Sequence, residues 1–292
     1  MKMLVTGGAG FIGSHTAEFY SPGNHVIVYD NLSRSQTFRT EGRIEKYNLN
    51  YLMQRNPKIE FFEADLRDFP SLEKAAKSAD AIIHTAGQVA VTTSLKDPRA
   101  DFETNALGTL NVLEAGRLND CAIVFCSTNK VYGENVNNIP VLEEARRYNF
   151  GDPQFVKGIP ESFSIDHTGH SPYGSSKLAA DTYVQDYAHT YGLKTGVFRM
   201  SCIYGERQFG VEDQGWLAWL VIASLTGRPI TIYGDGKQVR DVLYVGDLVR
   251  AFNKFLQSNI RHGVFNIGGG PENTLSLLEL LDLIGKKDRT PP

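Results

Sequence analysis

The sequence Leu4-Val-Thr-Gly-Gly-Ala-Gly-Phe-Ile-Gly-Ser14 decides the fold of this chain. The apolar run at residues 3–6 predicts a short buried strand, which leads directly into Gly7-x-x-Gly10-x-x-Gly13 and a helical pattern. Gly7 permits the tight turn that leaves the strand, Gly10 lets the backbone approach a pyrophosphate, and Gly13 lets the helix pack close to the sheet. The free N–H groups and the positive dipole end of this helix would then face the phosphates.

A carboxylate at the end of the next strand supports a dinucleotide site. The run His25-Val-Ile-Val-Tyr-Asp30 predicts a second strand, and Asp30 follows Gly13 by 17 residues. An acidic residue about 20 residues past the glycines binds the ribose hydroxyls of NAD, and it would repel the 2′-phosphate of NADP. Arg34 nearby weakens this discrimination slightly. We therefore predict dinucleotide binding with NAD preferred, the alternative being a glycine-rich turn in an ordinary α/β protein.

The bulk composition argues against several classes of partner and site. The 292 residues, 41% of them hydrophobic, are enough for one large domain or two smaller ones with a sizeable core. The net charge of −3 provides no general attraction to nucleic acid or to an anionic membrane, so neither is expected as a partner. Three cysteines without C-x-x-C spacing, and a start without a charged-then-apolar leader, predict a cytoplasmic location. The seven histidines show no His-x-x-x-His spacing, so no metal site is expected.

Strands and helices alternate through the first 200 residues. Short apolar runs without polar alternation are typical of strands buried on both faces, and their alternation with helices predicts a parallel sheet wound on both sides. Ligands of such a sheet bind at the carboxyl ends of its strands. The expected strands are residues 3–6, 25–30, 58–64, 81–86, 122–127 and 195–200, and the expected helices follow Gly10 and span 71–78, 101–118 and 175–191.

Beyond the last of these strands the alternation loosens, which predicts a second, smaller region. The expected fold class is α/β, with a Rossmann-type doubly wound parallel sheet in residues 1–200 and a mixed α/β substrate domain in residues 201–292. Residues 236–252 are expected to pack back on the first domain. Residues 31–56 are expected to carry a helix over the adenosine end of the cofactor, and residues 135–170 form either a substrate-side excursion or a surface loop.

A second motif, Tyr173-Gly-Ser-Ser-Lys177, carries residues suited to acid–base chemistry. The Tyr-x-x-x-Lys spacing places both side chains on one face of a helix, one turn apart. A free phenol, with a pKa of about 10, is a poor base at neutral pH, but a nearby ammonium group favours the phenolate and lowers that pKa. The pair could therefore accept a hydroxyl proton while a hydride leaves the same carbon. Taken alone the spacing is common, and its alternative interpretation is a surface tyrosine and lysine.

A third element is the strand Val124-Phe-Cys-Ser-Thr128, which ends with a hydroxyl at the carboxyl edge of the sheet. These three features, in this order, resemble the extended short-chain dehydrogenase/reductase family over essentially the whole chain. The resemblance implies that Thr128, Tyr173 and Lys177 form a catalytic triad in which Tyr173 is the acid/base. It also implies that Lys177 lowers the pKa of Tyr173 and holds the nicotinamide ribose.

The same resemblance implies the residues that bind NAD. Asp65-Leu66 would lie beside the adenine, and Ala86-Gly87-Gln88 beneath the nicotinamide half. Asn105 matches a family position on the helix after the fourth strand. The full expected set is Gly7, Gly10, Phe11, Ile12, Gly13, Asp30, Asn31, Ser33, Arg34, Asp65, Leu66, Ala86, Gly87, Gln88, Asn105, Tyr173, Lys177 and Met200.

The chemistry expected within this family depends on the residues after Thr128. Dehydratases of nucleotide sugars carry Asp-Glu there as the acid and base of elimination, whereas this chain carries Asn129 and Lys130. An amide cannot donate or accept a proton in that role, so dehydration is not expected. An epimerase that removes one hydride and returns it needs no additional acid–base pair, and the triad suffices.

Further stretches resemble the CDP-tyvelose 2-epimerase branch of the family. These stretches are residues 87–94, 127–133, 170–173, 207–216 and 236–241. The resemblance implies a nucleotide-diphosphate sugar as substrate and hydride removal and return at its C2 through a 2-keto intermediate. Arg240 is the first candidate for gripping the diphosphate, and Arg207 is the second. The expected substrate-binding residues are Gln88, Thr93, Asn129, Arg207, Gln208, Gln214, Tyr233 and Arg240.

A homodimer or homotetramer is expected, because helices 101–118 and 175–191 resemble those that pair across family dimers. Relatives continue past a last helix that corresponds to residues 275–284, so the substrate side is expected to be less enclosed and full activity is in doubt. The open alternatives are a UDP-hexose 4-epimerase, an oxidoreductase that releases NADH, and a redox-silent NAD-binding regulator. An intact triad argues against the regulator, although fold analogy alone would not exclude it.

Overall fold

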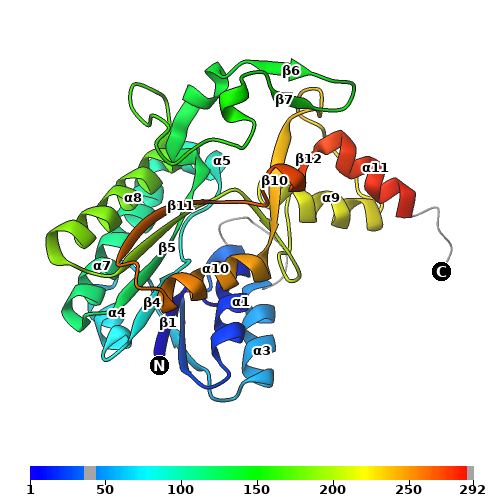
Figure 1. The fold of residues 1–292 in the computed structure, drawn as a ribbon. Helices are drawn as coiled ribbons and strands as arrows, with labels where there is room; N and C mark the ends of the chain where they lie inside the picture. Colours follow the sequence, from blue (N-terminus) through cyan, green and yellow to red (C-terminus); the bar gives the residue numbers. More distant parts are fainter. Residues whose placement is uncertain (36–43, 288–292) are drawn as a thin grey trace.

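The computed structural model describes residues 1–35 and 44–287. Its centre is a sheet of seven strands in the order β11-β8-β5-β4-β1-β2-β3, and every neighbouring pair is parallel. Helices cover both faces of this sheet (Figure 1), which confirms the predicted Rossmann-type fold class. The strands are β1 (Lys2–Thr6), β2 (His25–Asp30), β3 (Glu60–Glu63), β4 (Ala81–His84), β5 (Ala122–Thr128), β8 (Thr195–Met200) and β11 (His262–Ile267).

The central strands are buried on both faces because their side chains alternate between two apolar layers. Met3 and Val5 of β1 pack in one layer with α1, α3 and α10, whereas Leu4 packs in the opposite layer with α4 and α7. On that second side α7 and α8 also cover β5 and β8. The helices are α1 (Phe11–Tyr20), α3 (Ile44–Arg55), α4 (Phe69–Ala76), α7 (Gly108–Asn119), α8 (Ser171–Tyr191) and α10 (Val245–Gln257).

The order of the strands reverses between β1 and β4, and this position defines the binding crevice. β1 pairs with β2 on one side and with β4 on the other. In a doubly wound sheet ligands bind beyond the carboxyl ends of the strands at such a switch point. The glycine turn after β1 and the turn after β4 meet there, since a Cβ on Gly7 would lie 2.6 Å from Ala86 N.

Two features of the sheet and its helices differ from the sequence-based expectation. The expected helix over 101–118 lies within a continuous helical stretch made of α6 (Pro98–Phe102), a π-helical turn η1 (Glu103–Leu107) and α7, of which only the π-helical turn was not expected. In addition, β11 pairs with β8 at the edge of the central sheet. The central sheet therefore takes its last strand from beyond residue 200, which no local pattern indicated.

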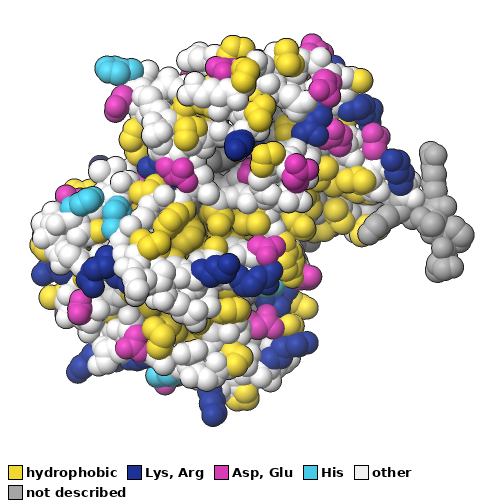
Figure 2. All heavy atoms as spheres, in the orientation of Figure 1, with side chains coloured by type: hydrophobic (Ala, Val, Ile, Leu, Met, Phe, Trp, Pro, Cys, Tyr) yellow, Lys and Arg dark blue, Asp and Glu magenta, His cyan; other side chains and the backbone are white. Residues whose placement is uncertain are grey.

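The second region stands beside the carboxyl ends of the strands as a smaller lobe, with apolar side chains gathered over α9 (Figure 2). In its sheet β10 pairs with β9 in parallel and with β12 in antiparallel orientation. The apolar run 229–233 was interpreted from the sequence as a short strand, but it has no regular structure. The elements are β9 (Cys202–Tyr204), α9 (Trp216–Leu225), β10 (Val239–Tyr244), η4 (Pro271–Asn273), β12 (Thr274–Ser276) and α11 (Leu277–Lys287).

The irregular segment 135–170 lies against this second region and is more than a surface loop. Tyr148 N donates to the Lys237 carbonyl oxygen at 3.0 Å, and Arg147 pairs with Glu279 of α11 at 3.3 Å. The segment therefore packs on the second region and is not a free surface loop. The elements before and within it are α5 (Val91–Lys96), η2 (Asn129–Asn138), β6 (Val141–Glu143), β7 (Tyr148–Phe150) and η3 (Pro153–Phe155).

The helix expected within residues 31–56 is α3, whereas residues 36–43 of that segment lie outside the described part of the chain, as do residues 288–292 at the end. Among the helices of residues 1–35 and 44–287, none has the length and apolar character needed to cross a bilayer.

Candidate active site

The turn after β1 leaves no room for side chains and remains open on one side. A Cβ on Gly13 would lie 2.1 Å from the carbonyl oxygen of Gly7, which adopts a φ of +68°. A Cβ on Gly10 would meet, among the described residues, only that same oxygen, at 3.0 Å. The turn is therefore closely packed at Gly7 and Gly13 and open at Gly10. A pyrophosphate at a helix N-terminus requires this arrangement. Phe11 and Ile12 follow as the first residues of α1.

Asp30 is held at the carboxyl end of β2, beside the glycine turn. Its Oδ2 accepts a hydrogen bond from Ala9 N at 3.0 Å, and its Oδ1 accepts one from Leu32 N at 2.8 Å. These two bonds fix the carboxylate where the ribose of a bound dinucleotide would lie. The residues present therefore fit the adenosine half of NAD.

A chain of polar contacts continues from Asp30 to the expected adenine site. Ser33 Oγ donates to Asn31 Oδ1 at 2.7 Å, and Asn31 Nδ2 donates to Asp65 Oδ2 at 2.8 Å. Arg67 holds the Asp65 carboxylate with two N···O distances of 2.9 and 2.8 Å, and this pairing keeps the pKa of Asp65 well below its usual range. Leu66 between them is buried. Arg67 was not predicted as part of the site. The only sequence feature that could have indicated it is its position two residues after Asp65.

On the nicotinamide side a buried network ties the turn after β4 to α8. Asn105, in the π-helical turn, accepts from Gln88 N at 2.9 Å and has its Nδ2 3.1 Å from Ser176 Oγ. Asp101, only 1% exposed, accepts from Ser176 Oγ at 2.5 Å and from Gln88 Nε2 at 2.7 Å. A Cβ on Gly87 would lie 2.9 Å from Asn105 Oδ1. Gln88 and Asn105 therefore hold the wall of the crevice in place. Asp101 belongs to the same hydrogen-bonded network and was not predicted from the sequence.

The three residues of the expected triad come together at the carboxyl end of β5. Thr128 ends β5, while Tyr173 and Lys177 lie one turn apart on α8, and all three are buried. The Thr128 hydroxyl lies beside the Tyr173 phenol, close enough to affect its pKa. Lys177 Nζ donates to the Cys126 carbonyl oxygen at 2.7 Å and lies 4.2 Å from the centroid of the Phe125 ring. Met200 of β8 is the register partner of Thr128 and completes this edge of the crevice.

The electrostatics of the triad differ from the expectation. Burial raises the pKa of Tyr173 to about 12, although the interaction with the Thr128 hydroxyl lowers this pKa. Burial lowers the pKa of Lys177 to about 8. The sequence predicted that Lys177 lowers the pKa of Tyr173, whereas in the structure the ammonium group is turned to the Cys126 carbonyl. A phenolate at Tyr173 therefore requires a positive charge to be brought close to it.

A second buried network lies behind Thr128 and was not predicted. Ser127 Oγ donates to Asp181 Oδ2 at 2.6 Å, and Arg199 holds both oxygens of the same carboxylate at 3.0 Å. Arg199 also donates to Tyr132 Oη at 3.1 Å. Two sequence features could have indicated this network. Asp181 follows Lys177 by four residues, and Arg199 is a lone arginine within an apolar strand.

Comparison with known proteins places these features in a family. Residues 3–268 match the NAD dependent epimerase/dehydratase family. The chain belongs to this family. Its sequence is 44% identical over 296 residues to the CDP-paratose 2-epimerase of Salmonella typhi, covering 97% of this chain and 83% of that protein. A putative UDP-glucose 4-epimerase of Methanocaldococcus jannaschii is 36% identical, with 97% and 81% covered.

Solved structures of the family share the fold. The Thermus thermophilus UDP-glucose 4-epimerase in complex with NAD superposes with a TM-score of 0.77 and is 33% identical, covering 100% of this chain and 85% of that one. The family is NAD dependent, and NAD is the cofactor of this chain. The predicted family and cofactor are thereby confirmed.

The residues expected to bind the nucleotide sugar in this family member lie in several places. Arg240 on β10 is near Lys130, whose pKa is lowered first by burial and then by Arg240. Gln208 and Gln214 line a hollow of about 160 Å³. Tyr233 is 70% exposed and donates to Glu212 at 3.1 Å. Asn129 is exposed at the start of η2, and Thr93 lies half-buried on α5.

The Arg207 side chain contacts the first region of the chain. Its guanidinium pairs with Glu18 of α1 at 2.7 Å and stacks over the ring of Tyr51 of α3 at 4.2 Å from the centroid. The loop after β9 thus carries Arg207 onto the elements that surround the cofactor crevice.

Proposed function

We propose that the chain is an NAD-dependent nucleotide-sugar epimerase that acts at C2 of a CDP-linked sugar. The observation that carries this proposal is the meeting of three buried side chains, Thr128 at the end of β5 and Tyr173 and Lys177 one turn apart on α8. Asn129 in the next position supports epimerisation over dehydration, because an amide does not serve as a proton donor or acceptor. The 44% identical CDP-paratose 2-epimerase supports the choice of sugar carbon and base.

In this proposal Tyr173 moves the proton. Its phenolate oxygen takes the proton of the sugar hydroxyl, and the Thr128 hydroxyl orients the same group. Lys177 supplies the positive charge that the phenolate requires, once its ammonium group leaves the Cys126 carbonyl. NAD bound at the glycine turn and Asp30 would supply the hydride acceptor and donor for C2, and the overall reaction would be redox neutral. Tyr173 gives the proton back after the 2-keto sugar has presented its other face.

The binding roles follow the two regions of the molecule. Residues 1–200 bind NAD through the glycine turn and Asp30, and residues 201–292 bind the nucleotide sugar, with residues 236–252 packed back on the first region. Arg240 and Lys130 form a cationic pair suited to a diphosphate, and this pairing is supported by the effect of Arg240 on the pKa of Lys130. Tyr233, exposed on the same side, is available to stack on the base.

The test is proton NMR of the protein with CDP-paratose in D₂O, with no NAD added. A change in the coupling pattern of the C2 proton without deuterium uptake is the expected result, because the hydride never leaves the site. A second candidate, a UDP-hexose 4-epimerase, is favoured by the names of the Methanocaldococcus and Thermus relatives. Interconversion of a UDP-hexose at C4 with CDP-paratose untouched would establish that candidate and reject C2 chemistry. Release of NADH would reject an epimerase.

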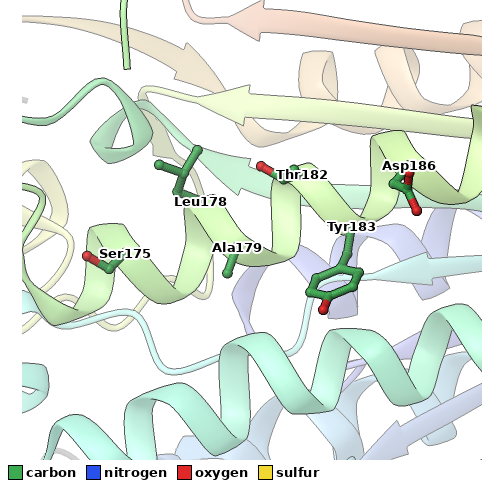
Figure 3. A pocket seen from close by; sticks show the side chains of 6 residues that line it. All are labelled: Ser175, Leu178, Ala179, Thr182, Tyr183 and Asp186. Atoms are coloured by element: carbon green, nitrogen blue, oxygen red, sulfur yellow. The ribbon is translucent and has the colours of Figure 1, made fainter. Parts of the chain in front are cut away.

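We also propose that the chain forms a homodimer through α8. Figure 3 shows a groove on the solvent side of this helix with side chains spaced three and four residues apart. The groove has a volume of about 490 Å³ and includes Ala179 and the exposed Tyr183. A small residue beside an exposed aromatic ring on a 21-residue helix is suited to helix–helix packing between two copies. Light scattering coupled to size-exclusion chromatography measures this directly.

A further inference from the structure

The segment 206–209, which we call the clasp, leaves the second region and docks on the cofactor-binding elements. The Glu206 carbonyl oxygen lies 2.9 Å from His15 Nε2 of α1. The Glu206 side chain accepts a hydrogen bond from Tyr244 of β10 at 2.8 Å, which keeps the clasp attached to its own region. The clasp therefore bridges the two regions of the molecule.

Arg207 makes the central contact of the clasp. Its Nη2 donates to Glu18 Oε2 at 2.7 Å, and the other oxygen of Glu18 accepts from the Tyr51 hydroxyl at 3.1 Å. The guanidinium plane stacks over the same Tyr51 ring. The Glu18 carboxylate therefore binds both Arg207 and Tyr51, and the Arg207 side chain is only 10% exposed. A planar guanidinium satisfies an ion pair and a ring contact together, which an ammonium group does less well.

The other end of the clasp is fixed by Phe209. Its carbonyl oxygen accepts from Arg34 Nη2 at 3.1 Å, and its ring meets that of Tyr47 of α3 at 5.3 Å between centroids. Arg34 follows Asp30 closely, so this contact reaches the segment that leads from the ribose-binding carboxylate. The clasp consequently touches α1, the segment after β2, and α3.

The clasp contains two residues with positive φ and two buried polar atoms without a hydrogen-bond partner among the described residues. Arg207 and Phe209 have φ values of +61° and +48°, in the left-handed region that non-glycine residues seldom adopt. Arg207 Nε and Gln208 Oε1 are buried and have no hydrogen-bond partner among the described residues. Strained backbone and unpaired buried atoms persist only where other contacts hold them, and such features concentrate at ligand clamps.

We propose that the clasp retains NAD in its crevice and that Arg207 is its positioning residue. The elements it joins are those that enclose the adenosine half of the crevice: α1 begins at the glycine turn, and Arg34 follows Asp30. Separation of these elements requires the Arg207–Glu18 pair to break. An epimerase that returns its hydride gains from a cofactor that does not exchange between turnovers. The proposal depends on the NAD cofactor of the family and is independent of the proposed sugar.

The experiment measures release of radiolabelled NAD from the loaded protein during a chase with excess unlabelled NAD. Arg207→Ala should release NAD at least about tenfold faster, because the clasp then loses its ion pair with α1 and its ring contact with α3 and the elements around the crevice separate more readily. The rate of NAD release from Arg207→Lys should lie between those of wild type and Arg207→Ala, because lysine keeps the charge and loses the stacking on Tyr51. Arg250→Ala, which removes an arginine paired with Asp247 on the surface of α10, is the matched control and should release NAD at the wild-type rate.

Three outcomes decide the proposal. Faster release in Arg207→Ala that is restored in the exchanged pair Arg207→Glu with Glu18→Arg supports it. Unchanged release with a raised KM for the nucleotide sugar overturns it and returns Arg207 to the substrate site. Should Arg207→Ala fail to fold, Glu18→Gln and Tyr51→Phe weaken the same contacts while keeping the arginine, and unchanged release in both overturns the proposal.

Discussion

Asp181 and Arg199 form a bidentate ion pair beneath the candidate active site, with both N···O distances at 3.0 Å. Asp181 is fully buried and Arg199 is 6% exposed, and the same carboxylate also accepts from Ser127, which precedes Thr128. Asp181 lies on α8 one turn past Lys177. The pair therefore joins the strand that carries Thr128 to the helix that carries Tyr173 and Lys177.

Asp181→Asn should destabilise the protein strongly, because it leaves the buried Arg199 without its charge partner. Breaking a buried pair in this way costs about 3–5 kcal/mol. Urea unfolding of the two proteins measures the difference in the free energy of unfolding. Asp166→Asn, at an exposed position in the segment 135–170, is the control and should remain within about 0.5 kcal/mol of wild type. An equal, small effect of the two substitutions would show that the pair contributes little.

Tyr173→Phe should reduce turnover by about 10²–10⁴-fold, the usual contribution of a positioned acid or base. The phenylalanine ring fills the same buried space, so the stability and the NAD content should change little. Tyr191→Phe, at the exposed end of the same helix, should leave turnover unchanged. Turnover of Tyr173→Phe within a few-fold of wild type would reject Tyr173 as the acid/base.

Lys177 should make the protein more stable as the pH rises from about 8 towards 10. Burial lowers its pKa to about 8 in the folded protein from an ordinary value of 10.5, so the unfolded state binds more protons in this window. The contribution across the whole interval is on the order of 3 kcal/mol. The measurement is the free energy of unfolding against pH for wild type and Lys177→Met, whose difference isolates this group. Parallel curves for the two proteins would show that Lys177 is not titrating in this range.

Gly13→Ala should abolish NAD binding. The added Cβ would lie 2.1 Å from the Gly7 carbonyl oxygen, so the helix and the turn that receive the phosphates must move apart. Gly285→Ala on α11 is the matched control, because no atom of the described residues lies within 4 Å of a Cβ there and alanine favours a helix. Absorbance of the cofactor retained after purification and desalting checks both variants. Retained NAD in Gly13→Ala would show that the turn tolerates a side chain.

Ala179→Arg should convert the proposed dimer to a monomer. The substitution places a large charged side chain in the middle of the α8 groove. The mass in solution, measured by light scattering, should fall by half, while the helical circular dichroism is kept. Leu225→Arg, at a 71% exposed position on α9, tests whether any added surface charge has this effect. A monomeric wild-type protein would reject the dimer outright.

Much of the candidate site could be predicted from short stretches of sequence. The glycine turn, Asp30 and the Tyr173–Lys177 pair are defined by spacing within one turn or one helix, and local backbone geometry then decides where they point. The π-helical turn that carries Asn105 was not predicted, since its hydrogen bonds go to Gln88 and to Ser176 of α8. Such contacts are invisible in the spacing of neighbouring residues.

The sequence by itself determined the alternation of strands and helices, the glycine turn and the placement of Tyr173 and Lys177 on one helix face, because each depends on residues that are close along the chain. Only the tertiary structure decided that β11 completes the sheet, that Lys177 turns to Cys126, and that Arg207 reaches Glu18. Arg207 and Glu18 are 189 residues apart, and the sequence pattern treats both as ordinary charged residues. Their meeting depends on how the second region packs against α1, so it becomes visible only when the whole chain is folded.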